Sequence, residues 1–180
     1  MPSIITHVAV PLAMYCAAGR GKVSKRLLAA GIITAALPDL DVVAFAFGIP
    51  YADALGHRGA SHSIVFALLL AFVGGALHRP LRSRPLQAAA WIFVCALSHP
   101  LLDALTSGGL GVALLWPFSG QSFFAPWRPI LVSSFANGFF SACGIATLWS
   151  ELRWMWLPLF AAGMAWKLLQ RRASTRNAGF

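Results

Sequence analysis

The sequence is poor in charged residues, and acidic residues are the scarcest. Asp, Glu, Lys and Arg make up 11% of the 180 residues, and only 5 residues are Asp or Glu. A soluble domain carries roughly 25% charged residues, so this chain has too few to cover a surface that faces water. Hydrophobic residues make up 58% of the sequence, and the mean hydropathy is +0.72. The composition argues against an ordinary soluble domain and predicts an integral membrane protein.

Cysteine is scarcer still, with three residues in the whole sequence. Cys16, Cys95 and Cys143 lie singly within apolar runs, and no pair has the CxxC spacing. This argues against a thiolate metal site or a disulfide framework and favours small packing residues. A secretory signal peptide is not expected either, because no basic residue precedes the first apolar run.

Apolar runs are abundant, and no strand-like alternation interrupts them. A backbone in hydrocarbon must satisfy its own hydrogen bonds, so these runs are predicted to be helices. We expect one transmembrane helical domain over residues 1–180, an all-α integral membrane bundle of about five to six apolar helices. Residues 1–120 carry the candidate site motifs, 130–169 form additional membrane helices and 170–180 form a basic tail. The runs are Ile4–Ala18, Leu27–Phe47, Ile64–Leu77, Leu86–Leu105, Ile130–Leu148 and Trp154–Leu169.

Lysine and arginine outnumber acidic residues by 14 to 5, which gives a formal net charge of +9. Most of them fall in three clusters beside apolar runs, the pattern that marks the cytoplasmic loops of membrane proteins. We therefore expect a multi-pass membrane protein that contacts the lipid bilayer, and we do not expect nucleic-acid binding. The clusters are Arg20, Lys22, Lys25 and Arg26; Arg79, Arg82 and Arg84; and Lys167, Arg171, Arg172 and Arg176.

The third basic cluster conflicts with a count of six spans. Two spans separate the first two clusters, which therefore share a side, but six full spans place the basic tail on the opposite side. Either Ile130–Leu148 and Trp154–Leu169 are not two full spans, or the charge rule fails there. Trp154–Leu169 is short and contains Pro158, so partial or interfacial insertion is expected for this run.

The few remaining ionisable residues are concentrated in four short motifs, each at the edge of an apolar run. Up-and-down packing of consecutive helices brings all four motifs to one end of the bundle, on the non-cytoplasmic face opposite the basic loops. Imidazole and carboxylate groups together suit a divalent cation, with Zn²⁺ preferred and Mn²⁺ or Fe²⁺ as alternatives. The motifs are Thr6-His7, Leu37-Pro38-Asp39-Leu40-Asp41, His57-Arg58-Gly59-Ala60-Ser61-His62-Ser63 and Ser98-His99-Pro100-Leu101-Leu102-Asp103.

The spacing within these motifs suits metal ligation. His99 and Asp103 are four residues apart, so they share one face of a helix that continues through the intervening proline. Asp39 and Asp41 are two apart. Either Pro38 breaks the helix and lets both point inward, or Asp41 binds the metal while Asp39 orients a neighbour. Seven candidates exceed the three protein ligands of one catalytic zinc, so two or more ions are plausible. The candidates are His7, Asp39, Asp41, His57, His62, His99 and Asp103.

Any one of these residues alone has an ordinary structural interpretation, because buried Asp and His side chains in membrane bundles often link helices. Their restriction to one end favours a shared site. The other ionisable residues stay structural: His78 belongs to the opposite basic loop, and Asp53 lies in an outer loop without a partner motif. Glu151 beside Arg153 is expected at a solvated boundary.

In this order, the motifs resemble the YdjM-like family of predicted inner-membrane, metal-dependent hydrolases. The resemblance covers about residues 1–120, including Leu115-Trp116-Pro117-Phe118, which is similar to a Leu-Trp-Pro element of that family. It implies that the seven candidates form one metal site. More distantly, the family is similar to zinc-dependent phospholipase C and P1 nuclease, helical proteins that hydrolyse phosphoesters with a zinc cluster.

Motifs and resemblance together predict a membrane-bound hydrolase that cleaves a phosphoester with metal-activated water. A phospholipid or lipid-linked phosphate is the expected substrate, because the motifs lie near headgroup depth. Arg58 is expected to steady the anionic substrate with its planar donor fork, and Asp39 or Asp41 is a candidate general base. The alternatives are a divalent-metal or proton transporter and a non-catalytic membrane protein with a closed structural metal site.

Overall fold

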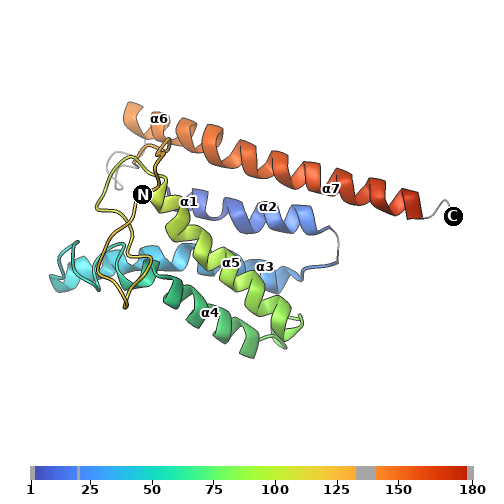
Figure 1. Cartoon of the computed structure of the whole chain (residues 1–180), viewed down its shortest axis with the longest axis horizontal. Coiled ribbons are helices and arrows are strands. Elements are labelled where there is room, and N and C mark those ends of the chain that lie inside the picture. Colours follow the sequence, from blue (N-terminus) through green and yellow to red (C-terminus); the bar gives the residue numbers. More distant parts are fainter. Residues whose placement is uncertain (1–2, 20, 133–140, 178–180) are drawn as a thin grey trace.

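The computed structural model describes residues 3–19, 21–132 and 141–177, and these residues are organised by helices (Figure 1). In these ranges no strand is formed, and extended pairing is limited to the isolated bridges Thr106–Ile130 and Val112–Phe123. The all-α prediction is confirmed for them. The elements are α1 (Ile4–His7), α2 (Ala9–Ala18), α3 (Lys25–Ala36), η1 (Leu37–Phe47), η2 (Ala60–His62), α4 (Ile64–Ala76), α5 (Pro85–Ala104), α6 (Ala142–Glu151), η4 (Leu152–Trp156) and α7 (Leu157–Asn177).

One continuous helix stands where the sequence predicted two. α6 passes through η4 into α7, and Figure 1 shows these elements as one rod. The wider, π-type turn of η4 lies just before Pro158, whose ring leaves a preceding carbonyl without its usual donor. The prediction of a helix from Ile130 is wrong, since Ile130 pairs with Thr106 in extended backbone. The rest of that expected start, residues 133–140, lies outside the described residues.

The helix directions bring the described residues of the three basic clusters to one end of the bundle. α2 and α7 pack together and run the same way, because Gly163 lies against Ala13 and Ala17, and Lys167 lies beside Gly19. Figure 1 shows the C-terminal part of α7 at the end that also holds the α2–α3 and α4–α5 connections. We call this end, formed by residues 21–26, 78–85 and 167–177, the basic end. The sequence placed the third cluster on the opposite side only because it predicted two late helices. With one late helix, all three clusters are expected on the same side.

α5 is the central helix and packs against both α3 and α4. Small residues allow the close approach: a Cβ on Gly74 would lie 2.7 Å from Ile92, and one on Gly31 would collide with Trp91. Close packing of this kind stabilises helix pairs where exclusion of water contributes little. The apolar core along α5 consists of Val23, Leu27, Ala35, Ala88, Trp91, Ile92 and Cys95.

Many apolar side chains face outward rather than into this core. Four of them are more than three-quarters exposed: Phe47 (79%), Phe72 (77%), Leu86 (81%) and Phe118 (86%). By length and hydropathy, two helical segments of the described chain are able to cross a bilayer: Lys25–Phe47 and Pro85–Ala104. Ile4–Ala18 and Ile64–Ala76 are apolar but shorter. A membrane bundle of five to six helices therefore stays a prediction.

Candidate metal centre

All seven predicted ligands reach one place, at the end of the bundle opposite the basic end. We call it the site end. The predicted convergence of the four motifs is therefore confirmed, because α1, η1, the loop before η2, η2 and α5 each bring at least one of these side chains. Six of them are buried, and Asp41 is partly exposed. The buried six are His7, Asp39, His57, His62, His99 and Asp103.

α5 supplies two of these side chains one helical turn apart. The helix continues through Pro100, so His99 and Asp103 share a face, with Nε2 3.9 Å from Oδ2. The other ring nitrogen of His99, Nδ1, lies 2.6 Å from the carbonyl oxygen of Ala35. A carbonyl only accepts hydrogen bonds, so Nδ1 carries the proton and Nε2 keeps a lone pair for a cation.

Asp39, His62, His99 and Asp103 form a compact group whose ligating atoms lie within 4.8 Å of one another. His99 Nε2 is 3.3 Å from Asp39 Oδ1 and 3.1 Å from His62 Nε2. The same nitrogen of His62 is 3.3 Å from Asp103 Oδ2. Ligands about 2.0–2.2 Å from a tetrahedral zinc lie roughly 3.3–3.6 Å apart. The spacing of the group therefore fits a four-coordinate cation.

Hydrogen bonding supports the same assignment. Both oxygens of Asp39 and Asp103 and both ring nitrogens of His7 are buried and make no hydrogen bond of good geometry within the described chain, although Asp103 is ion-paired with Arg58. Such orphaned atoms cost about 1–3 kcal/mol each, more when charged, unless a cation or other partner compensates. His7 lies beside the compact group, with Nε2 3.7 Å from Asp103 and its ring stacked on His99 at 3.6 Å between centroids. The donor set fits a divalent cation, with His7 as a neighbouring ligand.

Asp41 differs from Asp39 because its oxygens already accept hydrogen bonds. Oδ1 lies 2.6 Å from His57 Nδ1, while Oδ2 accepts from the Ser61 hydroxyl at 2.7 Å and from a backbone N–H at 3.1 Å. Asp41, His57 and His62 form a second group with metal-ligand spacing, and His62 belongs to both groups. The geometry favours Asp39 as a direct ligand and Asp41 as the residue that orients the imidazoles, the reverse of one predicted alternative.

The carboxylates around His62 also control its protonation. Burial alone lowers its pKa, but the nearby carboxylates of Asp103 and Asp41 outweigh burial and raise the pKa of His62 to about 9. The field that holds a proton there attracts a metal cation for the same reason. A proton and a metal cation would therefore compete for this imidazole.

Arg58, predicted to contact substrate, is a fixed cation inside the site. It is 2% exposed, and its Nε lies 3.1 Å from Asp103 Oδ2. Its terminal nitrogens donate to the Gly108 carbonyl at 3.1 Å and to the Thr106 hydroxyl at 3.0 Å. These contacts hold the guanidinium in one place, beside the candidate ligands.

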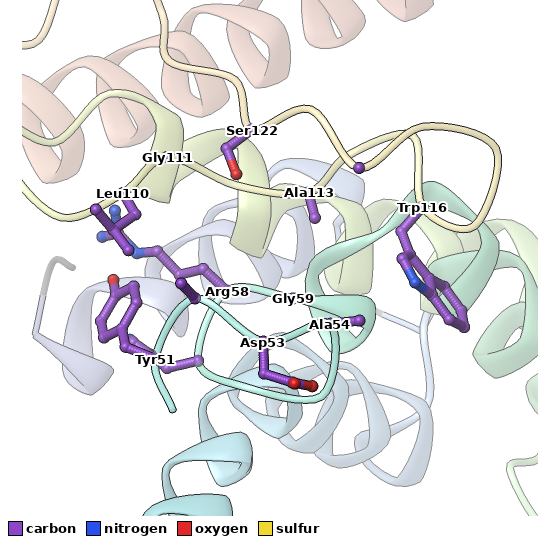
Figure 2. Close-up of a pocket in the computed structure, with 13 residues that line it drawn as sticks. Tyr51, Asp53, Ala54, Arg58, Gly59, Leu110, Gly111, Ala113, Trp116 and Ser122 are labelled. Carbon is purple, nitrogen blue, oxygen red and sulfur yellow. The ribbon is translucent and has the colours of Figure 1, made fainter. Parts of the chain in front are cut away.

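A cavity of about 310 Å³ opens next to this site, between the loops of residues 51–59 and 110–122 (Figure 2). Arg58 and His57 line it, and the same two residues contact Asp103 and Asp41 in the site. A molecule in the cavity therefore touches side chains that are bonded directly to the candidate ligands.

The expected solvated boundary at Glu151 is wrong. Glu151 is 1% exposed, and its carboxylate accepts hydrogen bonds from the backbone N–H of Ser3 and from the hydroxyls of Ser3 and Thr6, the last two at 2.6 and 2.7 Å. Trp156 Nε1 also donates to the Thr6 hydroxyl, at 3.1 Å. This network fastens α6 and η4 to the turn that ends at His7. Its partners lie 145 or more residues apart in sequence, so no local pattern pointed to it.

The residues set aside as structural lie away from the ligand groups. Asp53 accepts a backbone hydrogen bond within its own loop, and His78 bonds to a carbonyl within the 78–85 loop at the basic end. Among the cysteines, Cys95 is buried in the apolar core as predicted, whereas Cys16 and Cys143 are exposed.

An all-helical chain with an apolar exterior and buried His and Asp groups at one end defines the class: a helical protein with a candidate metal centre. The chain belongs to the family described as YdjM inner membrane protein, which it matches over residues 1–174. The family resemblance is thereby confirmed. The relatives carry the name inner membrane protein, so membership of a membrane protein family is confirmed as well.

The chain is 45% identical over 172 residues to inner membrane protein YbcI of Escherichia coli (strain K12), covering 92% of this chain and 98% of that protein. It is 35% identical over 146 residues to inner membrane protein YdjM of the same organism, covering 73% of this chain and 66% of that protein. YdjM of Shigella flexneri gives the same figures. No solved structure matches the chain. The distant similarity to zinc-dependent phospholipase C and P1 nuclease stays a prediction.

Proposed function

We propose that this protein is a membrane-embedded, metal-dependent hydrolase that acts on a phosphoester. The observation that carries the proposal is the group of buried Asp and His side chains whose ligating atoms face one another, several of them without hydrogen bonds. Ionisable groups are costly inside an apolar bundle, and a cation offsets that cost.

The chemistry of the donors supports a first-row divalent cation. Imidazole nitrogens and carboxylate oxygens suit zinc best, and manganese or iron accept the same donors. When bound, such a cation supplies Lewis-acid activation of water and neutralises charge on a phosphoryl oxygen. The residues that would hold it are Asp39, His62, His99 and Asp103, with His7 beside them. A second ion would engage Asp41, His57 and His62.

The protein's own side chains supply the remaining parts. With one ion bound, Asp41 holds the Nδ1 proton of His57, which leaves Nε2 of His57 able to accept a proton and then deliver it to a leaving oxygen. Arg58 places a fixed positive charge beside the ligands, where phosphoryl oxygens carry negative charge.

The cavity beside the centre supports catalysis over a purely structural cation. A structural site is coordinatively closed, whereas an enzyme needs access for substrate. The cavity of about 310 Å³ shares Arg58 and His57 with the site. A transporter site is expected near the middle of the helices, whereas these residues gather at one end.

Within the membrane we propose five crossings, with the basic end in the cytoplasm and the site end at the opposite face. Support comes from the position of all three basic clusters at one end. The shorter helices would require local thinning of the bilayer. The crossings are Ile4–Ala18, Lys25–Phe47, Ile64–Ala76, Pro85–Ala104 and the continuous helix Ala142–Asn177.

Elemental analysis tests the metal directly. Protein purified in detergent after metal supplementation should contain at least about one equivalent of zinc, manganese or iron, and His99→Ala should lose it. His78→Ala is the matched control, because it removes a histidine at the basic end and should leave the metal content unchanged. A wild-type protein without metal under these conditions would sink the proposal.

Activity assays then separate an enzyme from a structural site. The metal-loaded protein should hydrolyse at least one of a phosphomonoester, a phosphodiester and a phospholipid, and a chelator should abolish that activity. Bound metal with no turnover of any of the three would favour a structural cation. Metal flux into vesicles without hydrolysis would favour transport.

Labelling of single cysteines tests the orientation. In a variant without the native cysteines, Ser119→Cys lies in a loop at the site end and Ser83→Cys lies in the 78–85 loop. A membrane-impermeant maleimide should label Ser119→Cys in intact cells and leave Ser83→Cys unlabelled. The opposite pattern would invert the proposed orientation without affecting the metal assignment.

A further inference from the structure

We propose that the cavity between residues 51–59 and 110–122 is the subsite for the alcohol portion of the phosphoester, and that this portion is a small group with hydrogen-bond donors. The inference rests on the proposed hydrolase function and adds the part of the substrate that the protein recognises. A phospholipid headgroup and a soluble polyol phosphate share this chemistry.

The cavity has a cationic end and an aromatic end. Figure 2 shows Tyr51 and Arg58 together at one end, Trp116 at the other, and Ser122 on the upper loop between them. A Cβ added to Gly109 would lie 2.7 Å from an Arg58 terminal nitrogen and 3.0 Å from the Tyr51 hydroxyl, which places these two groups close together. A ligand that lies along the cavity therefore contacts the Arg58 charge at one end and the Trp116 ring at the other.

The cationic end adjoins the candidate metal centre. Arg58 reaches Asp103 there, with 3.1 Å between Nε and Oδ2. The site beyond is filled by side chains such as His62 and His99, which are 0% exposed. A phosphoryl group held beside Arg58 must direct its ester substituent away from these residues, and the cavity toward Trp116 is the open direction.

The size of the cavity limits what this substituent is. At about 310 Å³, the cavity lies near the lower end of the ~300–1,000 Å³ typical of small-molecule sites. It admits a group such as glycerol or ethanolamine and has no room for two acyl chains. Acyl chains would instead lie against the exposed apolar surface of the helices, where Phe47 and Phe72 face outward.

The polar lining favours a group that donates hydrogen bonds. Asp53 lies in the cavity wall, and its Oδ1 accepts the backbone N–H of Leu55 at 2.9 Å. Asp53 is exposed, and because a carboxylate only accepts, a ligand that reaches it must donate, through a hydroxyl or an ammonium group. Ser122 adds a hydroxyl that both donates and accepts, and the ring of Trp116 covers carbon atoms of the ligand.

Titration calorimetry on the metal-loaded protein in detergent tests the subsite without relying on turnover. The probes are inorganic phosphate, glycerol 3-phosphate, phosphoethanolamine and glycerol. We expect glycerol 3-phosphate or phosphoethanolamine to bind at least about tenfold more tightly than phosphate, the effect of ~1.4 kcal/mol. Glycerol alone should bind weakly, because it lacks the group that Arg58 and the metal attract.

Two variants and one control test whether the cavity causes the tighter binding of the alcohol phosphates relative to phosphate. Ser122→Phe fills the cavity and should remove the gain while leaving phosphate binding unchanged. Asp53→Asn keeps the acceptor for Leu55 but loses the charge, and should weaken the alcohol phosphates several-fold. Gln121→Phe adds the same ring at the neighbouring exposed position, which does not line the cavity, and should bind all probes like the wild type.

The outcomes distinguish this inference from the proposed function. Phosphate binding with no gain for any alcohol phosphate, or a gain that survives Ser122→Phe, would overturn the subsite and leave the hydrolase proposal standing. Metal-loaded protein that binds none of the phosphorylated probes would overturn both. Metal content measured on each variant shows whether the centre itself is intact.

The two substrate sources are separated by hydrolysis. Phosphatidylglycerol in mixed micelles presents the alcohol as a lipid headgroup, and glycerol 3-phosphate presents it in solution. Ser122→Phe should raise the KM for whichever of the two the wild type cleaves and leave hydrolysis of a phosphoester with a methyl alcohol portion unchanged. Equal loss for the methyl ester would contradict recognition of the alcohol.

Discussion

The two ends of the bundle differ in the sign and in the burial of their charged residues. At the basic end the charges are of one sign and exposed, as for Lys25, Arg26 and Arg79. At the site end both signs are present and buried, as for Arg58 and Asp103, which lie 3.1 Å apart. An exposed charge costs little and orients the chain in a membrane. A buried charge needs a partner, so the site end is where substitutions should have consequences.

The largest effect is expected from Asp103→Ala. It removes a candidate ligand and leaves Arg58 buried without its carboxylate, which should destabilise the protein by about 3–5 kcal/mol and abolish metal binding. Thermal unfolding in detergent and elemental analysis measure the two effects. Asp53→Ala, at the same end but exposed, should change neither. Full metal content in Asp103→Ala would remove this residue from the ligand set.

A smaller effect is expected from Glu151→Ala, which contacts no ligand but fastens the turn before His7. Misplacement of His7 should weaken metal binding by about 10–100-fold, as is usual for residues that orient ligands. Competition with a chelator measures the affinity, and the absorption spectrum of the cobalt-substituted protein reports the ligand geometry. Ser150→Ala removes a neighbouring buried hydroxyl and should leave the spectrum unchanged. A changed stability with an unchanged spectrum would make Glu151 structural only.

Asp41→Asn and Asp39→Asn test whether Asp41 orients the imidazoles while Asp39 binds the metal directly. If Asp41 only orients His57 and His62, the variant should keep its metal stoichiometry and lose about 10–100-fold in activity. Asp39→Asn should lose the metal itself. A fall from two ions to one in Asp41→Asn would instead show that Asp41 binds a second cation.

The smallest effect on the site is expected from the basic end. Replacing Arg79, Arg82 and Arg84 together with glutamine should leave metal content and activity per folded protein within about twofold, because these exposed charges lie at the other end of the helices. The orientation measured by maleimide labelling should become mixed, since the rule for cytoplasmic loops depends on such clusters. Loss of metal in this variant would show that the two ends are coupled.

The sequence predicted the site better than the path of the chain around it. His99 and Asp103 are four apart on one helix, and the motifs lie at alternating ends of apolar runs, so helix direction alone brings them together. The different bonding of Asp39 and Asp41 was not predictable, because it depends on Ser61 and a backbone N–H of a distant loop.

The late helix and Glu151 escaped prediction for a similar reason. The predicted runs were separated at residues 149–153, but the helix continues there into the π-type turn of Leu152–Trp156. Glu151 stands alone beside Arg153 in the sequence, which is typical of a surface position. Only the packing of α6 and η4 against α1 buries it against Ser3 and Thr6.

Pro38 has an influence that reaches beyond η1, where it lies in the first turn. In the i→i+3 pattern of that segment, the carbonyl of Ala35 would accept the N–H of residue 38, and proline has none. Pro38 therefore brings no donor to this oxygen, which accepts the Nδ1 proton of His99 at 2.6 Å. A proline on one segment thus leaves room at a carbonyl for a histidine on another helix, and replacing Pro38 would add a second donor at the oxygen that orients His99.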